Sequence, residues 1–139
     1  MAAFQKIPDF AEQVLKGVHN FAAHTFKVAL TNTAPQAANA VLADLTQIAA
    51  TGGYVSGGFA LDSVVLSETA GTAKVVVADE VIAASGGAMG PLRYAVVYND
   101  TASGKPLVGF YDYGSSITLN DGETLTVDFD QSAGVLTLA

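Results

Sequence analysis

The sequence predicts an all-β protein: a jelly-roll-like β-sandwich of about seven or eight antiparallel strands with a short N-terminal arm or helix. From Phe26 onward, short runs in which apolar and polar residues alternate follow one another. Clusters of Gly, Asn, Asp and Ser separate these runs at spacings of roughly 8–15 residues. Helical periods do not alternate with the runs, which disfavours a parallel α/β sheet. Residues 1–139 are therefore expected to form a single β domain.

Residues 1–21 are expected to form an N-terminal arm. Within it, 8–17 fit a short helix because Phe10, Val14 and Val18 recur every four positions and Gly17 can end the last turn. An irregular arm is the alternative. The sequence leaves open whether the arm packs on its own domain or reaches a neighbouring molecule.

The first strand is expected at 26–31, with Phe26, Val28 and Leu30 on one face and the residues between them on the other. A loop follows at 32–39, and 41–50 fit either a short helix or an extended piece. Further strands are expected at 59–67, 73–84, 92–99, 107–113, 117–119, 124–130 and 135–138.

Turn residues predict which strands form hairpins. Residues 100–105 are expected to join 92–99 to 107–113, and 68–72 are expected to close another hairpin. Asn120-Asp121-Gly122 favours positive φ and predicts a hairpin between 117–119 and 124–130. Residues 85–91 are expected to be a flexible connection. In the strand at 124–130 the alternation places Leu125, Val127 and Phe129 inward and Thr124, Thr126 and Asp128 outward.

Composition restricts the function more than any motif does. The net charge is −7, with six basic residues, so we expect no binding to nucleic acid or to anionic lipid. Charged residues make up 14% of the chain, against about 25% in typical soluble proteins. Either neutral polar residues cover the surface or part of it is buried against partners. The start lacks a leader pattern and no apolar run is long enough to span a membrane, so we expect a soluble product of the cytoplasm.

No catalytic, cofactor-binding or metal-binding residue is predicted, and no enzyme activity. The chain has no cysteine, no Gly-x-Ser-x-Gly elbow and no phosphate-binding loop. His19 and His24 are five residues apart without the further ligands that zinc requires, which favours structural histidines. The five tyrosines are more typical of strand pairs and interfaces than of a carbohydrate-stacking platform. These tyrosines are Tyr54, Tyr94, Tyr98, Tyr111 and Tyr113.

The carboxylates after Lys105 admit three interpretations. No basic residue follows Lys105, so 106–139 carry a charge of −5. A solvated acidic face is the simplest interpretation, and such a face could steer the protein onto a basic partner. A Ca²⁺ site or a glycosidase pair formed by Asp128 and Asp130 is the alternative. The acidic residues are Asp112, Asp121, Glu123, Asp128 and Asp130.

Five strand and turn segments are spread over nearly the whole chain: GVHNF (17–21), FKVALTNTAP (26–35), RYAVVYND (93–100), GFYDYG (109–114) and DGETLTV (121–127). They resemble the head-cementing, or decoration, proteins of tailed bacteriophages. The resemblance implies a jelly-roll-like domain, a homodimer, a place on the outer surface of the capsid, and binding to neighbouring major capsid proteins. It implies no active site. A tail or host-recognition protein is the alternative, and an enzyme acting on host glycan comes third.

Overall fold

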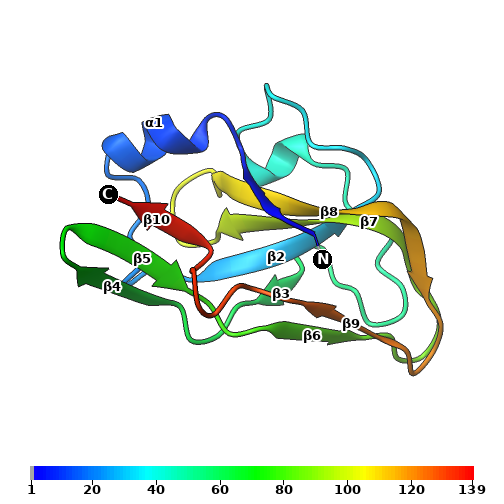
Figure 1. Ribbon diagram of the computed structural model, residues 1–139. Coiled ribbons are helices and arrows are strands. Elements are labelled where there is room, and N and C mark those ends of the chain that lie inside the picture. Colours follow the sequence, from blue (N-terminus) through cyan, green and yellow to red (C-terminus); the bar gives the residue numbers. More distant parts are fainter. Residues whose placement is uncertain (1) are drawn as a thin grey trace.

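The computed structural model describes residues 2–139, and this part of the chain is mostly β (Figure 1). It contains ten strands, one short α-helix and one turn of 3₁₀-helix. The elements are β1 (Phe4–Lys6), α1 (Phe10–Leu15), β2 (Phe26–Thr31), η1 (Leu42–Asp44), β3 (Phe59–Ala60), β4 (Val65–Thr69), β5 (Thr72–Val76), β6 (Glu80–Ala83), β7 (Met89–Asn99), β8 (Leu107–Leu119), β9 (Thr124–Val127) and β10 (Leu136–Leu138).

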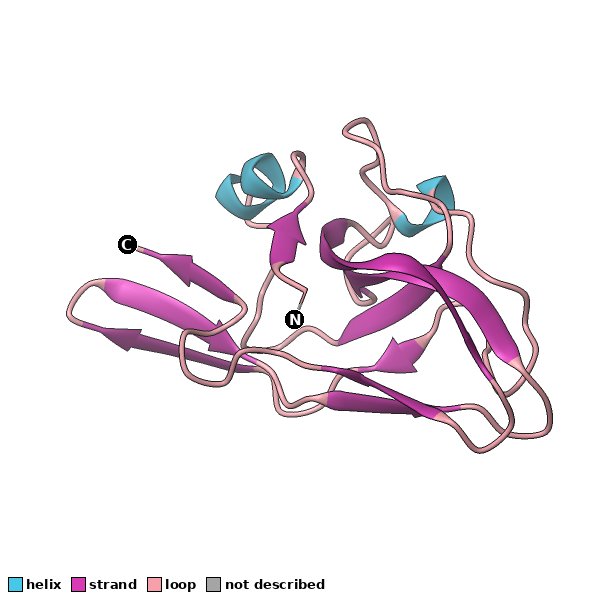
Figure 2. Cartoon of the chain, turned by 45° about the vertical axis from the view of Figure 1, so that its right-hand side comes forward, coloured by secondary structure: helices cyan, strands magenta, loops and turns pink. Residues whose placement is uncertain are grey.

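The strands form two layers, which confirms the predicted sandwich. One layer is a five-stranded sheet in the order β1-β8-β7-β2-β3. The facing layer contains a three-stranded sheet, β10-β5-β4, and a two-stranded sheet, β6-β9. Figure 2 shows the two smaller sheets running end to end beneath the large one. All the strand pairs are antiparallel.

The core lies between the layers and the predicted alternation of β2 is confirmed. Phe26, Val28 and Leu30 belong to the main apolar cluster, together with Val127 and Phe129 from the facing layer. The opposite face of the large sheet is also covered. There Ala29, Val96 and Tyr98 form a second cluster, against which Leu42 and Leu45 pack.

The segment 41–50 covers that outer face and combines the two predicted conformations. It contains the single turn η1, flanked by isolated bridges from Val41 to Pro106 and from Gln47 to Thr31. Because its apolar side chains pack on the sheet, the segment needs neither a full helix nor a full strand to be stable.

The hairpin of β7 and β8 is confirmed and is longer than predicted. Met89 is fully buried and pairs with Leu119, so the expected flexible connection at 85–91 already belongs in part to β7. The hairpin predicted around Asn120-Asp121-Gly122 is wrong. Its 117–119 arm pairs with β7, whereas β9 pairs with β6. The turn itself is present, since Glu123 N–H donates to the Asn120 carbonyl at 2.9 Å, but it carries the chain between layers.

The two long strands predicted at 59–67 and 73–84 are each divided. The first splits into β3 and β4, which belong to different layers, and the second splits into β5 and β6. The hairpin between them is confirmed with a shorter turn, because Thr69 already pairs with Thr72. Ala70 and Gly71 both have positive φ, as a tight two-residue hairpin turn requires. The inward positions Val127 and Phe129 and the last strand are confirmed.

The N-terminal arm packs on its own domain. β1 extends the large sheet by pairing with β8, and Ile7 N–H donates to the Val108 carbonyl at 3.0 Å. The short helix is confirmed as α1, with Phe10 buried in the main core. β1 was not predicted, because three residues are too few to show a period. β1 packs closely against Gly109, where any side chain would meet the Phe4 ring and the Gln5 carbonyl.

Candidate functional site

The two histidines meet at a buried asparagine. The side-chain amide nitrogen of Asn99 lies 3.2 Å from Nδ1 of His19 and 2.9 Å from Nδ1 of His24. The Asn99 carbonyl oxygen accepts from the backbone N–H groups of Thr101 and Ala102. Burial, helped by neighbouring His24, lowers the pKa of His19 to about 4. This Asn99 cluster (His19, His24, Asn99) holds residues 19–24 against the end of β7.

The Asn99 cluster has a structural role, because the Nδ1 atom of each histidine ring is engaged by the Asn99 amide. Nε2 of His19 is buried and has no hydrogen-bond partner among residues 2–139. With the Asn99 amide donating, both Nδ1 atoms accept and the proton of each neutral ring lies on Nε2. Among residues 2–139 no group of three or more His, Asp or Glu side chains is placed to hold a metal ion.

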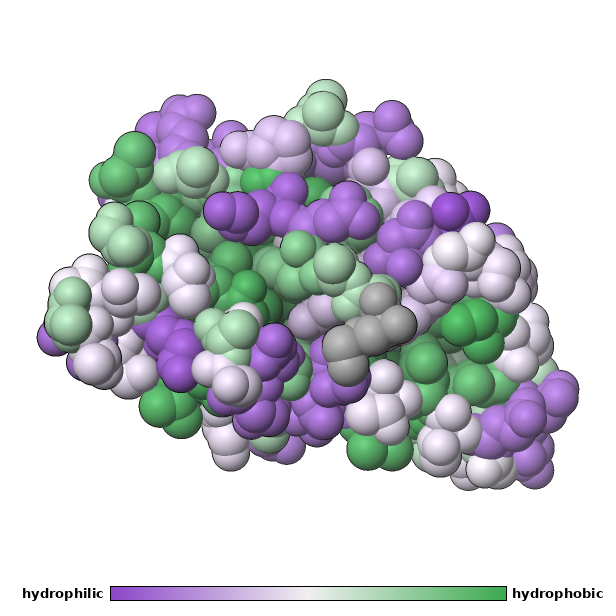
Figure 3. Space-filling model, viewed as in Figure 1, coloured by the Kyte–Doolittle hydropathy of each residue, from purple (hydrophilic) through white to green (hydrophobic). Residues whose placement is uncertain are grey.

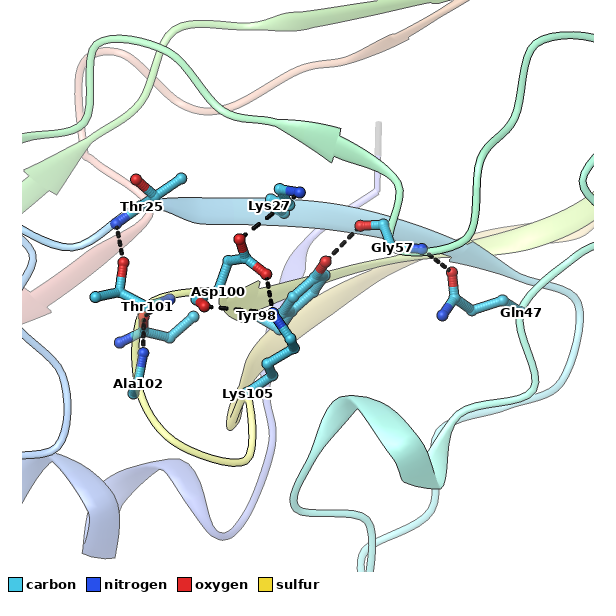
Figure 4. Close-up of polar contacts among 10 residues, drawn as sticks. Thr25, Lys27, Gln47, Gly57, Tyr98, Asp100, Thr101, Ala102 and Lys105 are labelled. Atoms are coloured by element: carbon cyan, nitrogen blue, oxygen red, sulfur yellow. Dashed lines mark hydrogen bonds and ion pairs between the residues drawn. The ribbon is translucent and has the colours of Figure 1, made fainter.

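A second polar cluster, formed by Lys27, Asp100 and Lys105, lies at the same end of the large sheet (Figure 4). Asp100 lies between Lys105, which it contacts directly, and Lys27, whose Nζ is 3.7 Å away. Hydrogen bonding to Lys105 lowers the pKa of Asp100. Nearby, the Tyr98 hydroxyl donates to the Gly57 carbonyl, and the Gln47 side chain accepts from Gly57 N–H at 2.8 Å. These bonds fix the loop before β3 to the sheet.

The C-terminal carboxylates are spread over several loops, where most of them bind backbone N–H groups. Asp121 accepts from Gly86 at 3.1 Å and Glu123 from Asn120 at 2.7 Å. Asp130 accepts from the N–H groups of Ser132 and Ala133, as an Asx-turn does. Asp128 is exposed beside this turn. These carboxylates stabilise connections between strands.

Asp112 differs from the other C-terminal carboxylates, because it lies on β8 and forms a two-point ion pair with Arg93 of β7. The distances are 2.8 Å from Nε to Oδ1 and 3.2 Å from Nη2 to Oδ2. The Arg93 hydrogen bonds lower the pKa of Asp112. The pair is a cross-strand contact of the sheet.

The tyrosines do not form a carbohydrate-stacking platform. Tyr54, Tyr94, Tyr98 and Tyr111 are buried and Tyr113 is half-buried, so no row of rings faces solvent. Burial raises the pKa of Tyr98 and of Tyr113 to about 12. The rings pack in the two apolar clusters as core side chains, in agreement with the strand-pair interpretation.

An apolar groove of about 590 Å³ lies between α1 and the three-stranded sheet. Large apolar side chains stand exposed on α1, β4 and β10, with exposed fractions of 88% for Leu15, 46% for Leu66 and 67% for Leu138. Figure 3 shows apolar residues gathered over α1 and β10 on this side of the molecule. The groove is lined by Lys6, Ile7, Pro8, Phe10, Ala11, Val14, Leu15, Phe21, Leu66, Ala73, Val75, Leu136, Thr137 and Leu138.

Sequence reasoning did not find this groove. The sequence features that could have indicated the groove were the low fraction of charged residues and two places where the regular spacing of apolar residues is interrupted. Val65 and Leu66 are consecutive, so β4 is apolar on both faces, and Val14 and Leu15 widen the apolar side of α1. Which of these residues meet could not be read from the chain, because α1, β4 and β10 come from three distant segments.

Comparisons with family models, with curated proteins and with solved structures find no match for this chain. Within residues 2–139 no helix has the length and apolar character needed to cross a membrane.

Proposed function

We propose that this chain is a structural protein of a tailed-bacteriophage virion that binds the outside of the capsid and holds neighbouring major capsid proteins together. The observation that carries the proposal is the apolar groove. Three exposed leucine side chains border it on a protein with few charged residues to cover its surface. Burying a side chain of this size gains about 1.5–3 kcal/mol, so the groove is a favourable place for a protein partner.

The sequence resemblance supports the phage head as the proposed location of this protein. Three of the resembling segments, 26–35, 93–100 and 109–114, include most of β2 and β7 and the middle of β8. These strands form the centre of the large sheet, so the resemblance concerns the scaffold of the domain. The groove is built mainly from α1, β4, β5 and β10, which lie outside those three segments.

Holding two capsid proteins together requires two contacts. One groove supplies one contact, and a homodimer with two-fold symmetry would present two equal grooves to two neighbouring subunits. Many such contacts over a symmetric shell add up, because each binding event raises the effective concentration of the next. Weak individual contacts therefore suffice to resist the outward pressure of packaged DNA.

The proposal is tested by preparing phage heads with and without this protein. We expect heads that lack it to lose their DNA at a lower temperature than complete heads, and in low salt that complete heads withstand, measured by nuclease sensitivity of the genome. Heads that stay intact without the protein would contradict the proposal. Electron cryomicroscopy of the particle separates the head from the tail, and density on the tail alone would support the alternative of a tail or host-recognition protein.

A further inference from the structure

The free edge of β10 runs along the apolar groove. β10 is the last strand of its sheet, and within the described residues, 2–139, it pairs with β5 alone. Leu136, Thr137 and Leu138 all line the groove, although neighbouring side chains of a strand point to opposite faces. Leu136 and Leu138 share one face of the sheet with the lining residues of β4 and β5, and Thr137 adds the free edge of β10. The groove therefore covers this face and reaches the edge of the strand, where backbone groups are unpaired. Among residues 2–139, no backbone hydrogen bond of these three residues goes to a segment other than β5.

The unpaired edge restricts what can occupy the groove. An occupant that covers β10 removes its outward N–H and C=O groups from water, and each buried group without a partner costs about 1–3 kcal/mol. A lipid chain or an apolar helix surface offers these groups no hydrogen bonds. An extended peptide supplies them and places alternate side chains in the apolar space beside them.

Lys6 places a positive charge at the β1 side of the groove, which favours an occupant with a negative charge there. Among residues 2–139 it is the only charged residue of the groove lining, and no carboxylate in this part of the chain is within ion-pair distance of it. By contrast, Lys16, Lys27, Arg93 and Lys105 each have a carboxylate partner, and Lys74 donates to the Ser132 carbonyl at 3.0 Å. An acidic group on the occupant would complete the pairing.

We infer that the groove receives an extended segment of the major capsid protein, which adds to the free edge of β10 as a further strand. The segment has apolar side chains at alternate positions and a carboxylate near Lys6. This inference rests on the proposed function, because the partner is the capsid. It goes further by naming the surface, the conformation of the partner segment and its chemistry.

Photo-crosslinking on assembled heads tests the inference. p-Benzoylphenylalanine placed at Leu138, beside the groove, should crosslink to one contiguous segment of the capsid protein. The same probe at Val81, on β6, is the matched control, because Val81 is a similarly exposed apolar residue that is not part of the groove lining. Val81 should give no such product. A Leu138 crosslink to a second copy of this chain, or equal capsid crosslinks from both positions, would overturn the inference.

Hydrogen exchange measures the strand addition itself. In the isolated protein the outward amides of β10 should exchange rapidly, and on capsids at least one should slow by tenfold or more. Leu138→Asp should weaken capsid binding at least tenfold, whereas Val81→Asp should bind like wild type. Binding without protection of β10 would overturn the strand addition and leave the proposed function intact. If the wild-type protein does not bind capsids, the proposed function and this inference both fail.

Discussion

The side-chain amide nitrogen of Asn99 lies 2.9 Å from Nδ1 of His24 and joins the end of β7 to the segment that follows α1. This contact matters for the groove, because α1 forms one of its walls and is held on one side by β1 and on the other by residues 19–24. Asn99 is completely buried and uses both ends of its amide. The side chain thereby couples the N-terminal arm to the sheet.

Replacing Asn99 by Ala should lower the free energy of unfolding by about 2–4 kcal/mol. The change leaves Nδ1 of His19 and two backbone N–H groups without their partner, and it leaves Nδ1 of His24 with the Asn20 N–H alone. Hydrogen bonds of this kind contribute about 1 kcal/mol each, or more when the remaining group stays buried. Urea denaturation measures the difference. Asn32→Ala is the control, because Asn32 makes an exposed hydrogen bond to Ser116 and should change stability by less than about 0.5 kcal/mol.

His19 predicts an acid sensitivity of the fold. Its pKa falls from 6.5 to about 4 on folding, so the unfolded chain binds more protons between these values. Stability is therefore full above about pH 6.5, declines as the pH falls towards 4, and loses no more from this group below that. Because the ring is only half-buried, we expect a loss of about 1–2 kcal/mol.

The measurement is urea denaturation at pH 7 and at pH 5, above the range where most carboxylates titrate. His19→Phe keeps the ring among Phe10, Phe21 and Phe26 and removes the titrating group. The variant should lose less stability than wild type between the two pH values. An equal loss in both proteins would assign the acid sensitivity to another group.

Local pattern predicted the sandwich and many of its strands, because the period-two alternation of 26–31, 92–99 and 124–130 separates the residues on the two faces of a strand. Pairing was harder to predict. Asn120-Asp121-Gly122 specifies a reversal of the chain, but whether the following strand returns to β8 or crosses to β6 depends on packing between layers. The sequence within the turn does not encode that choice.

The groove could not be predicted for the same reason. Leu15, Leu66 and Leu138 are unremarkable as single residues, since isolated exposed apolar side chains are common on protein surfaces. They form one surface only because β10 returns next to β5 and α1 folds back beside both. The surroundings of the two histidines were hidden from the sequence as well. His19 and His24 do come together, as their spacing allowed, but around an asparagine 75 or more residues away.

The close contact between Gly109 and β1 predicts the effect of a substitution at Gly109 on the packing of β1. Gly109→Ala should displace β1, because the added methyl group would overlap the Phe4 ring and the Gln5 carbonyl. We expect a loss of about 1–3 kcal/mol, typical of overpacking, and faster exchange of the β1 amides. In a double-mutant cycle, Phe4→Ala should relieve part of this cost, so the two changes should not be additive. Full additivity would show that the ring is not what the methyl group meets.

Substitution of the C-terminal carboxylates Asp128 and Asp130 tests whether this chain is a binding protein or a glycan-cleaving enzyme. Asp128→Asn should leave both folding and capsid stabilisation unchanged, because Asp128 is exposed and makes no hydrogen bond through its side chain within residues 2–139. Asp130→Asn should lower the free energy of unfolding by at most about 1 kcal/mol, since an amide oxygen can still accept from the N–H groups of Ser132 and Ala133.

The double variant is compared with wild type in the heat-resistance assay of phage heads and in release of sugar from host surface polysaccharide. Wild-type heat resistance with no sugar release from either protein is expected. Sugar release by the wild type that disappears in the double variant would instead establish the enzyme.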